Sequence, residues 1–230
     1  YPAEGGKPEI TDIPDSETDR AEELRNELIE KAAENDEALM ELFFENDGLT
    51  EDEMRKGITA GVVARGMFPV FCASARNNMG VGRFMEFITN VAPSADELPP
   101  AKTEDGEEVQ CDASGSASLF VFKTTVETHI GEINFFKVYS GQVKEGDDLT
   151  NNATRNKERF SQIFAPLGKN RTKVPSLSAG DIGCTVKLKG TKTNQSLTAP
   201  EVSYEFEKIP FPEPKFRTAI RPVSEGDEEK

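Results

Sequence analysis

The chain has 230 residues, enough for one large domain or two ordinary ones. Its formal net charge of -15 disfavours general affinity for nucleic acid, because like charge repels phosphate. No apolar run approaches the roughly 20 residues that a bilayer-spanning helix needs, and no signal-peptide pattern is present, so we expect a cytoplasmic protein without a membrane partner. The three cysteines are isolated from one another, which favours reduced thiols.

The first half of the chain predicts helices. Residues 1–18 are rich in Gly, Pro and acids, which predicts a flexible lead-in. From Asp19 apolar residues recur at helical spacing, so we expect two consecutive helices, or one helix broken near Asn35. Residues 50–53 (TEDE) have the sequence of a capping box, in which the Thr and Glu side chains satisfy backbone N–H groups at a helix start. This third helix should end near Gly66.

A continuous apolar run, residues 67–73, follows the third predicted helix. It is too short for a helix and predicts a strand buried on both faces. A polar loop over residues 74–80 comes next, and then a helix with one apolar side that Pro93 stops. This order is typical of the last unit of a parallel α/β sheet, in which ligands bind at the carboxyl ends of strands. We therefore assign residues 19–98 to an α/β domain, with the loop on its ligand side.

The rest of the chain predicts β structure. Residues 99–113 are expected to be a linker, and residues 114–208 carry short apolar runs separated by turn signals. Five runs predict strands: 119–126, 133–139, 148–152, 159–166 and 182–188. The first two should form a hairpin, because the corner between them is short. This spacing predicts a closed or nearly closed β-barrel of about 90 residues. A fresh strand is expected within residues 209–230.

One stretch of the predicted barrel reverses the acidic average. It holds six basic residues, with Glu158 as the only acid among them: Arg155, Lys157, Arg159, Lys169, Arg171 and Lys173. A phosphate-facing patch on an acidic protein has this composition. The alternative is a solvated barrel face, which this stretch alone favours because charge runs usually lie in water.

Several nucleotide and catalytic motifs are absent from the sequence. It has no GxxxxGK[ST], and so no loop that cradles nucleotide phosphates in the P-loop manner. Residues 156–159 (NKER) begin like a guanine-reading NKxD motif but lack its Asp. His129 is the single histidine, and without partner ligands at metal spacing it predicts a surface turn residue. We assign no catalytic residue and no metal site.

Three groups of short motifs follow one another along the chain. They are residues 69–75 (PVFCASA) with 78–81 (NMGV), residues 135–141 (FFKVYSG) with 179–182 (AGDI), and residues 211–214 (FPEP). As an ordered set they resemble the translational GTPase elongation factor G family. The groups are similar to the close of its GTP-binding domain, to its second domain and to the start of its third domain.

The resemblance implies a multidomain α/β plus β architecture. A partial P-loop GTPase-type α/β segment would be followed by a barrel like domain 2 of elongation factor Tu, with residues 209–230 starting a third domain. Ser74 and Ala75 match the motif in which a backbone amide contacts the guanine base. Full-length members bind GTP and magnesium, but this chain lacks the P-loop, both switches and NKxD. We expect it to bind no cofactor alone.

The resemblance also implies a function and partners. The parent would be a ribosomal translocase GTPase that moves tRNA and mRNA, with the barrel docked on small-subunit ribosomal RNA and proteins. Lys137 and the six basic residues are the RNA-binding candidates, and we expect the chain itself to be monomeric. Lys187 stands where the family usually has Gly, and residues 194–195 (NQ) where it has Gly-Asp. These departures leave a divergent ribosome-binding paralogue, of the ribosomal protection type or with weakened GTPase activity, as an alternative. A stand-alone β-barrel interaction module is the third hypothesis.

Overall fold

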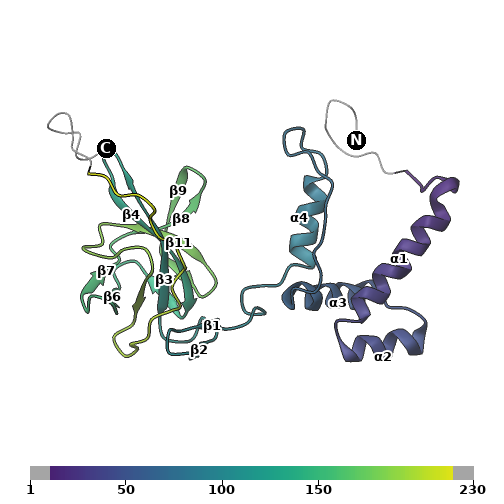
Figure 1. Cartoon of the computed structure of the whole chain (residues 1–230), viewed down its shortest axis with the longest axis horizontal. Helices are drawn as coiled ribbons and strands as arrows, with labels where there is room; N and C mark the ends of the chain where they lie inside the picture. Colours follow the sequence, from purple (N-terminus) through teal and green to yellow (C-terminus); the bar gives the residue numbers. More distant parts are fainter. Residues whose placement is uncertain (1–10, 220–230) are drawn as a thin grey trace. The chain divides into compact units, whose positions relative to one another are not determined.

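The computed structural model describes residues 11–219, and the chain divides into two compact units, Tyr1–Leu98 and Pro99–Lys230 (Figure 1). The first, the helical unit, begins with a 3-10 helix at Asp15–Glu17, inside the predicted lead-in. Residues 1–10 of that lead-in lie outside the described residues. Four helices follow: α1 Thr18–Ala33, α2 Glu37–Asn46, α3 Glu51–Val63 and α4 Val81–Asn90.

The predicted helix break near Asn35 is confirmed. Asp36 caps α2, and its Oδ1 accepts from the Leu39 N–H at 3.0 Å. The capping box is confirmed as well. The Thr50 Oγ1 accepts from the Glu53 N–H at 3.4 Å, while the Glu53 Oε2 accepts from the Thr50 N–H at 2.8 Å. α2 and α3 therefore each start where a side chain of their own sequence satisfies a free N–H group.

The end of α3 differs slightly from its prediction. The left-handed residue is Arg65, with φ 59°, rather than Gly66. The Gly66 N–H instead donates to the Gly61 carbonyl at 2.8 Å, a bond that closes the last turn.

The prediction of a buried strand over residues 67–73 was wrong for the described structure. This segment forms no strand there, and Phe68 and Val70 are 77% and 91% exposed. The Phe71 ring packs edge-on against Phe84 and Phe87 of α4, with ring centroids 5.4 and 4.9 Å apart. A strand is buried on both faces only when paired strands and covering layers surround it. Among residues 11–98 no strand pairs with this segment.

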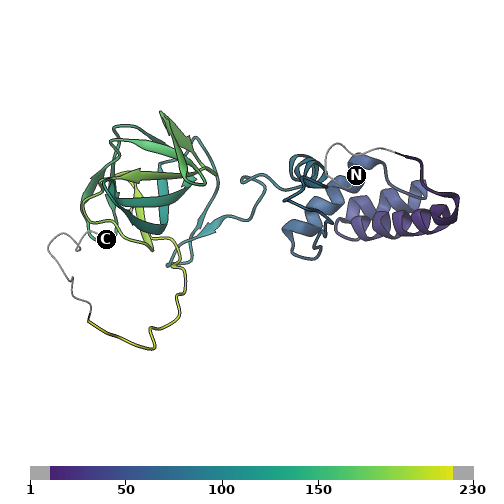
Figure 2. The same ribbon diagram turned by 90° about the horizontal axis from the view of Figure 1, so that it is seen from above.

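The second unit, the barrel unit, is a curled antiparallel sheet (Figure 2). Its strands are β1 Ala101–Lys102, β2 Glu108–Val109, β3 Ser118–Glu127, β4 Gly131–Ser140, β5 Gln142–Lys144, β6 Asp148–Asn151, β7 Lys157–Arg159, β8 Ile163–Leu167, β9 Asn170–Val174, β10 Ser176–Ser178, β11 Ile182–Val186 and β12 Gln195–Thr198. Eight of them pair in the order β7-β6-β12-β3-β4-β11-β8-β9. β5 pairs with β10, and β1 pairs with β2.

The predicted hairpin is confirmed as β3 and β4, the longest antiparallel pair of the sheet. The strands expected at 148–152 and 182–188 are confirmed as β6 and β11. The run 159–166 is not one strand, because the chain leaves the ladder at Phe160 between β7 and β8. The Phe160 ring is fully buried and packs edge-on against Phe136, with centroids 5.5 Å apart. Its backbone N–H donates to the Asp147 carbonyl at 2.9 Å, and its carbonyl accepts from the Gly146 N–H at 2.7 Å.

The two segments that flank the predicted barrel also differ from expectation. Residues 99–113 contain β1 and β2 rather than only a linker, and Thr103 forms a bridge to Phe206. Residues 209–219 form no strand, and the remainder of the strand expected within 209–230 lies outside the described residues.

The core of the barrel unit lies inside the curled sheet. Its buried apolar side chains come from both strands of the β3–β4 hairpin and from the short strands that follow. They include Leu119, Val121, Phe136, Val138, Phe160, Ile163 and Leu197. Along β3, Leu119 and Val121 alternate into this core, whereas Phe120 between them is buried on the other face, where its ring lies 6.5 Å from that of Phe206.

We predict that Gly141→Ala destabilises the barrel unit by about 2–4 kcal/mol. Gly141 has φ 68°, and an added Cβ would lie 2.6 Å from the backbone nitrogen of Ala117. Gly168→Ala is the matched control, because Gly168 has φ 60° but nothing within 4 Å of its added Cβ. The control should lose only about 1 kcal/mol. Urea unfolding followed by circular dichroism measures both, and equal losses would contradict the steric argument.

Candidate nucleic-acid interface

The six predicted basic residues do not form one patch. Arg155, Lys157 and Arg159 lie in the β6–β7 turn and in β7, at one end of the strand order. The other three lie in the β8–β9 turn and in β9, at its other end, and are Lys169, Arg171 and Lys173. β6 and β7 appear at one side of the barrel unit, and β8 and β9 at another (Figure 1).

Carboxylates accompany most of the second group. Arg171, 18% exposed at its side chain, pairs with Glu127, and the Lys173 Nζ lies 2.7 Å from the Glu145 Oε1. In the first group Arg159 reaches Asp148 at 3.6 Å. Arg155 and Lys157 form no ion pair within the described residues. Exposed ion pairs add little stability, but they reduce the local positive potential that would attract a phosphate.

Lys137 occupies a different environment, on the central strand β4. Its Nζ lies 5.1 Å from the centroid of the Tyr139 ring, in a cation–π contact. Burial raises the pKa of the Tyr139 phenol above its usual value. Lys137 is thus held along an aromatic surface, and its role in RNA contact stays a prediction.

The structure shows a further basic segment that the sequence prediction missed. The lysine loop, residues 187–194, joins β11 to β12 and exposes Lys187, Lys189 and Lys192. None of the three forms an ion pair in the part of the chain that the structure describes. Its sequence, KLKGTKTN, contains no acid, a signal that was readable without the structure. Residues 151–200 hold nine Lys and Arg but only two acids, Glu158 and Asp181.

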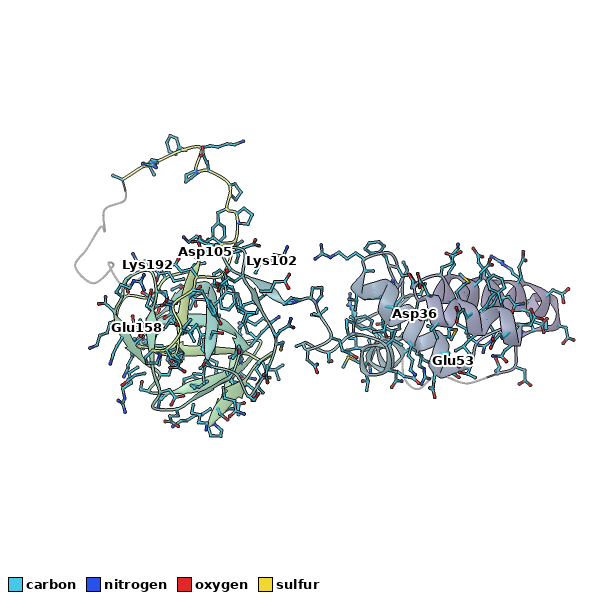
Figure 3. All side chains as sticks on the ribbon, turned by 90° about the horizontal axis from the view of Figure 1, so that it is seen from below. Asp36, Glu53, Lys102, Asp105, Glu158 and Lys192 are labelled. Carbon is cyan, nitrogen blue, oxygen red and sulfur yellow. The ribbon has the colours of Figure 1, made fainter. Side chains whose placement is uncertain are left out.

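Glu158 of β7 is 1% exposed and holds the lysine loop. Its Oε2 accepts from the Lys189 N–H at 2.8 Å, and its Oε1 from the Gly190 N–H and the Thr191 hydroxyl, both at 3.0 Å. Glu158 and Lys192 lie at the same side of the barrel unit (Figure 3). Bonds of this kind to a carboxylate are stronger than neutral ones, so the acid fixes the backbone that carries the lysines.

Two buried asparagines extend this network. The Asn151 Nδ2 donates to the Thr191 Oγ1 at 3.1 Å and to the Gln195 Oε1 at 3.0 Å. The Asn134 Nδ2 donates to the Thr191 carbonyl at 3.0 Å. Thr191 is therefore bound from β4, β6 and β7 together, and the centre of the loop is attached to three strands.

The loop connecting the helical unit's exposed segment to α4 is also ordered by hydrogen bonds. Ser74 and Met79 exchange two backbone bonds, of 2.9 and 3.0 Å. Gly80, with φ 72°, ends the loop and caps α4. Within the described residues no hydrogen bond from the Ala75 N–H is found.

No cluster of three or more His, Cys, Asp or Glu side chains within residues 11–219 is arranged to hold a metal ion. None of the described helices is long and apolar enough to cross a membrane. The three cysteines are free, and burial raises the pKa of the Cys184 thiol.

Comparison with known proteins identifies the barrel. Residues 116–199 match the family model for elongation factor G domain 2. Over these residues the barrel unit is similar to elongation factor G domain 2. A crystal structure of a protein from Thermus thermophilus is similar beyond this domain, with a TM-score of 0.71 and 26% sequence identity. The match covers 90% of this chain but 31% of that one, so the chain spans about a third of that protein's length.

Two residues at which the sequence departs from the expected elongation factor G pattern have a left-handed backbone. Lys187 has φ 65° and Asn194 has φ 69°. Glycine adopts this conformation without steric cost, whereas Lys does so at about 1–2 kcal/mol. Both residues therefore adopt a backbone conformation that glycine reaches without steric cost, and Lys187 carries a positive charge in that conformation.

We predict that Lys187→Gly stabilises the barrel unit by about 0.5–1 kcal/mol, because it removes the left-handed strain of a non-Gly residue. Lys187→Ala is the control, since it removes the same charge but keeps the left-handed strain. Urea midpoints of the two variants should therefore differ, with the Gly variant higher. Equal midpoints would show that the Lys187 backbone carries no strain.

Proposed function

We propose that this chain acts in a translation factor that binds the ribosome, and that the full-length protein is a GTP-driven translocase of tRNA and mRNA. The elongation factor G domain 2 at residues 116–199 is the observation that supports this most directly. In the proposal domain 2 contacts small-subunit ribosomal RNA, and the protein works in the cytoplasm.

The helical unit supports a second part of the proposal, that residues 19–98 close a P-loop GTPase-type α/β domain. Its exposed apolar segment, residues 67–71, lines a groove of about 600 Å³ together with Leu28, Ile58 and Phe87. An apolar surface of this kind needs a partner layer. The strands of a parallel sheet would pair with residues 67–73 and cover them. This exposed segment favours a larger domain over a stand-alone barrel module.

Within that domain, Ser74 and Ala75 would contact the guanine base of GTP. The Ala75 N–H, which has no acceptor within the described residues, suits such a contact. We propose GTP and magnesium as ligands of the full-length protein rather than of this chain alone. The reason is that one backbone amide is a small part of a nucleotide site.

We predict that the isolated chain binds no GTP in the micromolar range. One hydrogen bond contributes about 0.5–1.5 kcal/mol, while micromolar affinity needs about 8 kcal/mol. Isothermal titration with GTP and magnesium measures this, with ADP as the control for nonspecific nucleotide binding. A micromolar Kd selective for GTP would contradict the assignment of Ser74 and Ala75 as one contact of an otherwise missing site.

Ribosome binding is tested by co-sedimentation. We expect the chain to pellet with isolated small ribosomal subunits at low salt and to be released as the salt concentration rises, because phosphate contacts are salt-dependent. Failure of both this chain and the full-length gene product to pellet would overturn the proposal. GTP hydrolysis and translocation assays on the full-length product distinguish a translocase from a protection-type or weakened paralogue.

A further inference from the structure

We propose that Glu158 is a positioning residue for an RNA-binding surface, which it builds by fixing the lysine loop beside Arg155 and Lys157. This inference rests on the proposed function, since it specifies which face of domain 2 contacts RNA. It also departs from the sequence prediction, because the lysine loop takes the place of Lys169, Arg171 and Lys173 as the RNA-binding candidates.

Positive charges without a carboxylate partner gather on the lysine loop. Lys187, Lys189 and Lys192 are exposed and form no ion pair in the described region, whereas Arg171 and Lys173 already face carboxylates. Of the two acids in residues 151–200, Glu158 is buried and directs both of its oxygens to donors of the loop. The charged residues of the loop itself are all lysines. Glu132 of β4 lies close to the centre of the loop, because its Oε1 accepts at 3.4 Å from the Asn134 Nδ2 that also donates to the Thr191 carbonyl.

The lysine loop is held in place by hydrogen bonds. Residues 187–194 belong to no strand, yet the loop is bound at Lys189, Gly190 and Thr191 by one carboxylate. The Lys192 N–H is bound as well, by the Gln195 Oε1 at 2.8 Å. A loop ordered before binding loses less conformational entropy when a ligand arrives. Glu158 therefore favours an anionic ligand although it is itself an acid.

One buried residue connects the lysine loop to the turn that carries Arg155. Asn151, which bonds to Thr191 by its Nδ2, uses its Oδ1 to accept from the Ala153 and Thr154 N–H groups at 3.1 and 3.2 Å. Its carbonyl accepts from the Arg155 N–H at 2.8 Å. The turn that carries Arg155 and the loop that carries the lysines are consequently built on one buried residue.

The chemistry of this surface selects a phosphate backbone. Lysines bind phosphate as point charges, and the loop has no aromatic side chain on which a base could stack. Binding should therefore follow the shape and charge of RNA rather than its sequence. An acidic protein surface is the alternative partner, and polyglutamate represents it as a competitor of RNA.

Glu158→Gln separates positioning from simple electrostatics. The substitution removes one negative charge, so electrostatics alone predicts tighter RNA binding. The Gln amide, however, offers one acceptor oxygen where two stood, and it points donors at the N–H groups of the loop. Positioning therefore predicts weaker binding.

The experiment measures binding of the full chain to a labelled 20-base-pair RNA duplex by fluorescence anisotropy, from about 50 to 200 mM salt. K187Q/K189Q/K192Q should bind about tenfold or more weakly, with a log Kd against log salt slope lower by about 2–3. K144Q/K169Q/K173Q removes the same number of positive charges, and its affinity for the duplex should fall by less than about threefold. The affinity of E158Q for the duplex should fall by about threefold or more, and its salt slope should also be lower. A loss of global stability alone would not lower the slope.

Thr191→Val is the second positioning variant, for use if circular dichroism shows that E158Q is unfolded, and it should weaken binding in the same direction. The inference is overturned if the two lysine triples behave alike, or if the folded positioning variant binds RNA as tightly as the unchanged chain. It is overturned as well if polyglutamate competes as well as RNA at equal charge. Duplex binding without small-subunit binding would reject the proposed function and leave the inference standing, whereas loss of both would reject both.

Discussion

The arrangement of β7 and the lysine loop depends on the burial of one carboxylate. Glu158 lies inside the unit with no cation partner among the described residues, and three donors of the lysine loop satisfy it. Leaving such a group without partners costs several kcal/mol. The barrel therefore cannot place β7 in its sheet without also closing residues 187–194 over it.

The same loop is tied to the segment by which the chain leaves the barrel. Asn194 and Ile209 exchange two hydrogen bonds of 3.0 Å, and the Ser196 Oγ accepts from the Phe206 N–H at 2.8 Å. Phe206 is buried against Tyr139, with ring centroids 4.5 Å apart. A ligand that moved the lysine loop would disturb the Asn194–Ile209 pair directly. The loop is thus placed to affect the path of the chain towards residue 210.

Local signals made much of this fold predictable, and contacts distant in sequence account for the errors. The β3–β4 hairpin and the Thr50 capping box depend on neighbouring residues, so their patterns sufficed. Residues 67–73 have the composition of a buried strand, but burial depends on partner strands that no local pattern reports. The lysine loop was missed for a similar reason. Its anchor, Glu158, lies 31 residues before Lys189, and a lone acid among basic residues resembles an ordinary surface charge.

The net charge of -15 is a poor guide to what the barrel can bind. Residues 1–98 contain 22 Asp and Glu against 9 Lys and Arg, whereas residues 99–230 contain 20 against 18, so nearly all of the acidic excess belongs to the helical unit. Attraction between exposed charges is screened within about 8–10 Å in physiological salt. A partner at the lysine loop therefore responds to the lysines near it rather than to the chain average. Because burial directs Glu158 towards the loop backbone, the acid of this basic stretch organises its positive surface instead of neutralising it.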